Sequence, residues 1–357
     1  DRDYNYMGAK LFSALSPGFA FEPQAQRYYK EILSIDSATM PGLVQRVNAM
    51  LEYEMPEQKD PILLRFLKVQ NSASLQRLQA DIRSMKIDLL AASNWMMALR
   101  LAKSEKEIAL LKKAAGMVMD AIQTAATRAQ PGKKEVSIQA VAEYILHHRG
   151  GRLAMPAVVA SGKHSAQPNY TSNLAVLPKA GPVVLDFATV VEGYHARATR
   201  TVPVAGDFGV ELRPLYEGVV AIHRKSMRAC IPGAMPSKLQ AAAATGFDEL
   251  DKRLIFSINA LGARKVLKVT HIAPIGLELE EGDAPQSFGT DQVIVVETAI
   301  YLPDEDGVTA KWRGTGIVLR DMVRITDAGN EVLTETLPLD ALAVEAMVKS
   351  TFNLPED

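Results

Sequence analysis

The chain has 357 residues, of which 48% are hydrophobic and 23% charged, with a formal net charge of −1. These values are typical of a globular protein with room for two domains, and they exclude a strongly basic nucleic-acid-binding protein. Its single cysteine, Cys230, excludes an internal disulfide and a cysteine-ligated zinc cluster. We expect a buried, unreactive thiol there.

No apolar run approaches the ~20 residues of a membrane span, so we expect neither a membrane nor a nucleic acid as partner. We predict a cytoplasmic protein. A chain that begins at Asp1 rather than Met leaves a removed leader open as an alternative.

Residues 1–100 carry amphipathic segments without a regular alternation of strand and helix. The best of these, "SASLQRLQADIRSM", places Leu75, Leu78 and Ile82 on one helical face. We predict a small N-terminal domain, α/β or mostly helical, over residues 1–100, and a second domain over residues 101–350.

The second domain opens with a strong helix signal. Ser104 and Glu107 form a capping box, and an apolar stripe at helical spacing follows. The stripe consists of Ile108, Leu111, Ala115, Val118 and Ile122. A second helix, "VSIQAVAEYILHH", comes next, and then the predicted strands "AMPAVVASG" and "GPVVLDFATVVEGYHARATRTV", the latter a hairpin that turns at Gly193.

The same plan recurs about a hundred residues later. A long helix, "ELRPLYEGVVAIHRKSMRACIPG", precedes "PSKLQAAAATGFDELDKRL", where Ser237 and Gln240 are spaced as a capping box. Three predicted strands follow: "HIAPIGLELE", "DQVIVVETAIYL" and "GTGIVLRDMVRIT". The repetition predicts an α+β domain with a pseudo-two-fold axis and a site between its halves.

These segments resemble, in order and spacing, the aminopeptidase P and prolidase branch of the creatinase–methionine aminopeptidase family, the M24-like "pita-bread" proteins. The motifs that carry the resemblance are "RGGRLAMPAVVASGKHSAQPNYTSN", "VVLDFATVVEGYHARATRTVPV", "IGLELEEGDAP", "VIVVETAIYLPDEDG" and "WRGTGIVLRDMVRITDAGNEVLT". The resemblance implies a curved antiparallel sheet covered by helices. It does not by itself imply activity.

Peptidases of this family hold two divalent metals with two Asp, one His and two Glu. The resemblance maps these five ligands, in order, onto Asp186, Arg197, Ala273, Glu297 and Arg320. Two histidines near the substrate map onto Asn169 and Glu280, and a family tyrosine onto Tyr301. Two of the five ligand types therefore remain, and two arginines stand where carboxylates are expected.

From this mapping we predict that Arg197 and Arg320 neutralise Asp186 and Glu297 in place of metal ions, and that no cofactor is bound. The predicted ligand-binding residues are Asp186, Arg197, Glu297, Arg320, Tyr301, Asn169 and His164. An alternative is a single Mn, Co or Zn ion held by Asp186, His271 and Glu297, which requires a bulge before Ile275.

No catalytic residue is assigned. The candidates are His195, Glu280, Glu297 and Asn169, and His195 shares a strand face with Arg197 by the period of two. Arg200 is expected to be structural, and "RAQPGKK" a solvated turn.

The resulting functional hypothesis is an aminopeptidase P-like protein that has lost its dinuclear metal site. It is a pseudoenzyme that binds a peptide or a small carboxylate or other anion, and the family predicts a homodimer. The alternatives are a metal-independent, creatinase-like hydrolase of an amide or guanidino compound, and a residual Xaa-Pro metallopeptidase.

Overall fold

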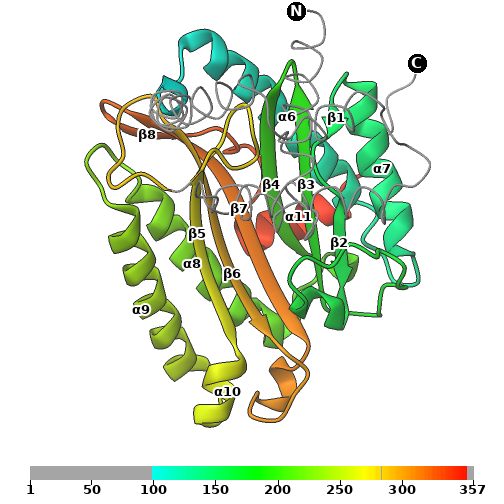
Figure 1. Ribbon diagram of the computed structural model, residues 1–357. Coiled ribbons are helices and arrows are strands. Elements are labelled where there is room, and N and C mark those ends of the chain that lie inside the picture. Colours follow the sequence, from blue (N-terminus) through cyan, green and yellow to red (C-terminus); the bar gives the residue numbers. More distant parts are fainter. Residues whose placement is uncertain (1–98, 283, 352–357) are drawn as a thin grey trace, which may run out of the picture. The chain divides into compact units, whose positions relative to one another are not determined.

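The computed structural model describes residues 99–282 and 284–351 (Figure 1). The chain divides into two units, residues 1–91 and 92–357, and the described residues all belong to the second. The predicted N-terminal domain lies outside the described residues apart from its last two positions. Its fold and its boundary at residue 100 therefore stay predictions.

The first helix pair confirms the predicted signals. Helix α6 (Glu105–Ala126) begins at Ser104, whose hydroxyl accepts from the Glu107 amide while its own amide donates to the Glu107 carboxylate at 2.8 Å. The predicted apolar stripe is buried along its whole length. Helix α7 (Glu135–His148) follows and contacts α6.

The second helix pair is α8 (Gly209–Arg228) and α9 (Pro236–Leu254). The capping box predicted at the start of α9 is wrong: its N-cap is Met235, and no side chain caps it. Pro236, which suits the first turn because it lacks an amide hydrogen, starts the helix instead. The Gln240 side chain donates to the Thr270 carbonyl at 3.2 Å.

Within the described residues, the strands form one antiparallel sheet of eight strands. Its strands are β1 (Arg152–Leu153), β2 (Val158–Ser161), β3 (Pro182–Val191), β4 (Tyr194–Pro203), β5 (Leu267–Pro274), β6 (Val293–Leu302), β7 (Thr315–Thr326) and β8 (Gly329–Val332). The predicted strand over residues 271–280 begins earlier and ends at Pro274, so "IGLELE" is not a strand. Strand β8 and the helices α10 (Ala260–Lys265) and α11 (Ala341–Lys349) were not predicted.

The order of the strands confirms the predicted repeat. The main path runs β1-β3-β4-β7-β6-β5, with β2 paired to β3 and β8 paired to β7. Each half thus contributes a helix pair and four strands, β1–β4 in the first half and β5–β8 in the second, and the halves meet where β4 lies beside β7. At this seam the strands are paired at one register position, Thr199 with Arg320. Thr201 reinforces it, since its hydroxyl donates to the Val318 carbonyl and accepts from the Val318 amide.

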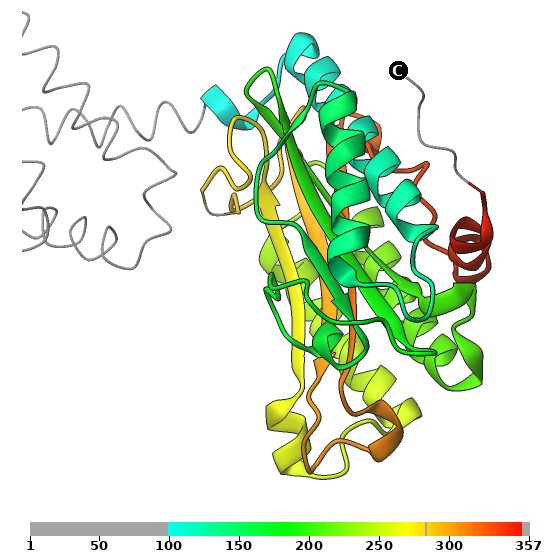
Figure 2. The same ribbon diagram turned by 90° about the vertical axis from the view of Figure 1, so that its right-hand side faces the viewer.

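The two faces of the sheet have different neighbours. Figures 1 and 2 show α6, α8 and α11 on one face of the curved sheet. Strand β3 follows the period of two: Leu185 and Phe187 belong to the core that includes the helices, whereas Val184 packs with Val158 and Val318 on the other face. Asp186, two residues from Val184, therefore points away from the helices.

Among the described residues, no helix is long and apolar enough to cross a membrane.

Candidate functional site

One row of side chains crosses the sheet on the face away from the helices. Successive register partners join Asp186 to Thr199, Thr199 to Arg320, Arg320 to Glu297, and Glu297 to His271. Directly opposed residues of antiparallel strands point to the same face with close Cβ atoms. The register of five strands therefore gathers charged groups from both halves of the domain.

Asp186 lies at one end of the row, on β3, and is almost fully buried. Arg197, two residues before Thr199 on β4, binds it in a bidentate pair: Nε donates to Oδ1 at 3.1 Å and Nη2 to Oδ2 at 2.7 Å. The Thr199 hydroxyl donates to Oδ1 at 2.8 Å. The hairpin of β3 and β4 thus directs a carboxylate and a guanidinium at the same point, as the sequence predicts.

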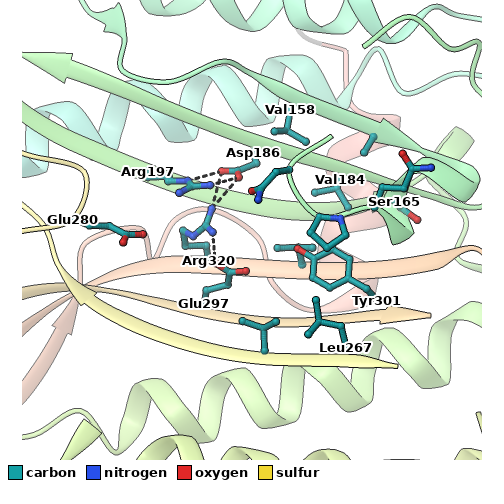
Figure 3. Close-up of a pocket in the computed structure, with 16 residues that line it drawn as sticks. Val158, Ser165, Val184, Asp186, Arg197, Leu267, Glu280, Glu297, Tyr301 and Arg320 are labelled. Atoms are coloured by element: carbon teal, nitrogen blue, oxygen red, sulfur yellow. Dashed lines mark hydrogen bonds and ion pairs between the residues drawn. The ribbon is translucent and has the colours of Figure 1, made fainter. Parts of the chain in front are cut away.

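Arg320 connects Asp186 to Glu297. Its Nη1 donates to both Asp186 oxygens at 2.9 Å, and its Nη2 donates to Glu297 Oε2. The structure thus brings together Asp186, Arg197, Glu297 and Arg320, the four charged residues that the sequence predicts in the cleft (Figure 3). That they bind a ligand stays a prediction.

The electrostatics of this cluster favour the ionised forms. Burial alone would raise the pKa of the Asp186 carboxyl, but the guanidinium groups of Arg197 and Arg320 outweigh it and hold this pKa well below its ordinary value. For Arg320, burial disfavours the cation, yet Asp186 and Glu297 raise its pKa above the usual range. The net stabilisation is small, because desolvation offsets most of the attraction within a buried ion pair.

A cavity of about 260 Å³ lies beside the cluster. Asp186, Arg197, Glu280, Glu297 and Arg320 form its charged end in Figure 3, while Val184, Leu267 and Tyr301 lie toward the other end. The remaining lining residues are Val158, Ala160, Ser165, Gln167, Pro168, Asn169, Val269 and Val318. A ligand in this cavity meets charge on one side and apolar side chains on the other.

Three further predicted residues line the cavity: Tyr301, Asn169 and Glu280. Burial raises the pKa of the Tyr301 hydroxyl, so it remains a neutral hydrogen-bonding group. Asn169 has a left-handed backbone, with φ of 57°. Glu280 pairs with His271 at 3.2 Å, and this hydrogen bond raises the pKa of His271 and lowers that of Glu280.

Two predicted histidines lie outside the cavity lining. His195 shares the strand face of Arg197, but its amide and its Nδ1 both lie against the Gly276 carbonyl, at 2.7 and 3.3 Å, and it is not placed as a base for the pocket. His164 stacks on Tyr170 with ring centroids 4.6 Å apart and lies 3.6 Å from Glu135, behind the cavity wall. His164 was predicted to bind the ligand and His195 was a candidate catalytic residue, but neither lines the cavity.

A second charged network lies directly behind the first, on the helix side of the sheet. Arg200, which follows Thr199, donates to Asp321 at 2.7 Å and to the carbonyls of Thr199 and Arg320. His223 from α8 completes the network through its Nε2, 2.8 Å from Asp321. Arg200 is fully buried, and its structural contacts agree with the role predicted for it. The helical pattern around His223 carries no signal for this contact.

The donor set of the charged end does not suit a divalent cation. Both Asp186 oxygens already accept from guanidinium groups, and a cation there would face two fixed positive charges. Within residues 99–282 and 284–351, no group of three or more His, Cys, Asp or Glu side chains is placed to hold a metal. His271, Asp186 and Glu297, the alternative set, are not assembled as such a group, because Arg320 lies between the two carboxylates and His271 bonds Glu280.

Comparison with known proteins settles the ancestry of the domain. A family model described as "Metallopeptidase family M24" matches residues 109–327. The chain belongs to metallopeptidase family M24. Its relatives place it in the aminopeptidase P and prolidase branch, and the architecture above is the pita-bread fold of that family.

Two curated relatives are representative. Xaa-Pro aminopeptidase 3 from Homo sapiens is 30% identical over 69% of this chain and 51% of the relative. "Intermediate cleaving peptidase 55, mitochondrial" from Arabidopsis thaliana is 26% identical over 79% of this chain and 56% of the relative. The chain thus spans little more than half the length of these two proteins.

A solved structure corrects one prediction. "Zn substituted E. coli Aminopeptidase P in complex with product" matches with a TM-score of 0.66 and 24% identity, over 70% of this chain and 60% of that one. This neighbour is described as zinc-substituted, and this finding contradicts the prediction that no cofactor is bound.

Proposed function

We propose that this M24 domain acts as a binding module for a small carboxylate, or for a short peptide through its carboxylate, and that it does not hydrolyse Xaa-Pro peptides. The observation that supports the proposal is the position of Arg320 between the carboxylates of Asp186 and Glu297. Arginine in this setting is a fixed cation with a planar set of donors, suited to hold carboxylates in place rather than to activate a water molecule.

The contacts of the cluster leave one guanidinium group open to a ligand. The Nε and Nη2 atoms of Arg197 are engaged by Asp186, while its Nη1 has no hydrogen-bond partner among the described residues. The Arg197 side chain is 16% exposed and lines the cavity. A ligand carboxylate bound there would gain a charge-assisted hydrogen bond from a donor whose orientation Asp186 already fixes.

The other end of the cavity defines the rest of the ligand. Val184 and Val318 belong to one apolar cluster, against which Tyr301 and Val269 pack, and Val158 extends this cluster to the side of Asp186. A branched aliphatic group of a small acid would bury its surface there, at about 25 cal/mol for each Å² removed from water. The volume of about 260 Å³ fits a ligand of one or two residues.

The test uses matched probes and ligand titration calorimetry. We expect 4-methylpentanoate to bind, and its uncharged amide, which has the same aliphatic group, to bind at least about tenfold more weakly because the charge-assisted bond is lost. Leu267→Ser should weaken both probes, because it removes apolar lining at the far end from Arg197.

A parallel assay tests hydrolysis. The protein is incubated with an Xaa-Pro dipeptide and an Xaa-Pro-containing tripeptide, alone and with added Mn²⁺, Co²⁺ or Zn²⁺. Turnover above that of a sample denatured by heat would contradict the proposal, as would equal affinity for the acid and the amide.

A further inference from the structure

One wall of the pocket is a loop rather than a strand. Residues 162–175, which we call the pocket loop, supply Ser165, Gln167, Pro168 and Asn169 to the cavity lining. Asn169 has a φ of 57°, a left-handed conformation that asparagine adopts more readily than most residues with a side chain. The shape of this wall therefore depends on what fixes the loop.

A buried carboxylate behind the loop accepts four hydrogen bonds. Glu135, in the first turn of α7, is fully buried. Its Oε1 accepts from the Ser161 amide at 2.8 Å and the Ser161 hydroxyl at 2.7 Å. Its Oε2 accepts from the Tyr170 hydroxyl at 2.8 Å and the Ala175 amide at 3.0 Å. One side chain thus binds the chain just before the loop, its last residue, and the residue that follows Asn169.

These contacts require a carboxylate. Each of the two oxygens accepts from a backbone amide, one at Ser161 and one at Ala175. A glutamine in the same place has one oxygen and one NH₂ group, so in either orientation one backbone N–H would face a donor. A buried N–H without an acceptor is costly, and the loop would move to relieve it.

Ala175 is also held through its carbonyl, which accepts from the Glu135 amide at 2.9 Å, whereas further attachments hold different points. The Asn173 side chain accepts from the Val159 amide and donates to Gln139 and to the Ala157 carbonyl. At the other end, the Gly316 amide donates to the Ser165 hydroxyl at 2.8 Å. Between these anchors, Tyr170 is held through Glu135 and through its stacking on His164.

We propose that Glu135 is a positioning residue for the pocket: its carboxylate fixes the pocket loop so that Gln167, Pro168 and Asn169 form the wall that a ligand contacts. The expected change in ligand affinity rests on the proposed binding function. The expected change in the loop does not depend on that function.

The test compares two buried glutamates. Glu135→Gln is the test variant, and Glu345→Gln is the matched control. Glu345 is also buried and accepts from a backbone amide, but its hydrogen bonds come from Phe208 and Arg213 rather than from the pocket loop. Hydrogen–deuterium exchange is measured over residues 158–177, and calorimetry measures 4-methylpentanoate affinity.

We expect Glu135→Gln to speed exchange at the pocket loop and to weaken the probe by about tenfold. Glu345→Gln should leave both unchanged. Tyr170→Phe removes one of the four bonds and keeps the ring, so it should show a smaller change of the same kind, and it carries the test if Glu135→Gln does not fold.

Unchanged hydrogen–deuterium exchange of the pocket loop in the test variants would overturn the inference. Faster exchange with an unchanged affinity for 4-methylpentanoate would also overturn it. If the wild-type protein binds no probe, the proposed function fails. Loop exchange alone then supports or overturns the role of Glu135.

Discussion

Arg320 Nη1 donates to both carboxylate oxygens of Asp186, at 2.9 Å each, from a strand of the opposite half of the domain. The same guanidinium reaches Glu297 through Nη2. One side chain on β7 therefore holds two carboxylates from two other strands, β3 and β6. Loss of Arg320 would leave the buried carboxylates of Asp186 and Glu297 with fewer hydrogen-bond donors.

We expect Arg320→Ala to lower the free energy of unfolding by about 3–5 kcal/mol, because removing one member of a buried ion network leaves charge uncompensated. Arg197→Ala should also cost kcal/mol rather than tenths, since Asp186 would lose its bidentate partner. Urea unfolding measures both. Arg313→Ala is the control, because its ion pair with the exposed Asp306 should contribute at most about 1 kcal/mol. Equal effects in all three variants would contradict the buried network.

Acid should destabilise the domain through the network behind the sheet. Burial raises the pKa of the Asp321 carboxyl, but Arg200 and His223 outweigh burial and lower it to about 2 from an ordinary 3.8. Because the pKa of Asp321 is lower in the folded than in the unfolded state, its ionised form stabilises the fold above the unfolded-state pKa. This stabilisation is lost as the pH falls toward the folded-state pKa. We expect the contribution of Asp321 to the free energy of unfolding to decrease by about 2 kcal/mol as the pH falls from about 4 to about 2. Urea unfolding at stepped pH measures it, and Asp321→Asn should flatten the slope.

His271 should titrate at a higher pH while Glu280 is present. The hydrogen bond to Glu280 raises the pKa of His271 in the folded state. The resulting stabilisation of the fold is present below the unfolded-state pKa of His271 and is lost as the pH rises through its folded-state pKa. Both side chains are substantially exposed, so we expect only tenths of a kcal/mol. An NMR titration of the imidazole in Glu280→Gln should show a lower pKa, whereas Glu278→Gln, which removes a nearby carboxylate that pairs with Arg100, should not.

Two glycines should respond to alanine with opposite signs. A Cβ on Gly316 would lie 1.8 Å from the Ser165 carbonyl oxygen, so Gly316→Ala must displace the pocket loop and lower the thermal midpoint. Gly116 lies within α6 with open space around its missing Cβ. Gly116→Ala should therefore stabilise the protein by about 0.5–1 kcal/mol. Calorimetric unfolding compares the two, and a neutral Gly316→Ala would contradict the close packing of the loop on β7.

Local signals were the most predictable part of the fold. Ser104 and Glu107 form the expected capping box because both partners lie in one helical turn. Ser237 and Gln240 have the same spacing but form no capping box, because Pro236 starts the helix and the Gln240 side chain donates to the Thr270 carbonyl. The same limit applies to β5, whose end at Pro274 depends on its pairing with β6.

The candidate site was predictable where strand register decides it. The pairing of Asp186 with Arg197 follows from the hairpin, and Tyr301 and Asn169 line the cavity as expected. His164 and His195 do not line the cavity. They lie beside Glu135 and Gly276, which are distant in sequence and which sequence patterns do not place next to them. Glu135 itself carries no sequence signal beyond an acid in a first helical turn. The predicted homodimer and cytoplasmic location stay predictions.

The junction of β4 and β7 links the two halves of the domain largely through side chains. Its backbone pairing is confined to Thr199 and Arg320, and side chains of Arg200 and Thr201 supply the remaining links. Arg320 is part of this junction and also lines the cavity. A replacement at this position therefore changes the lining of the cavity and the link between the two halves at the same time.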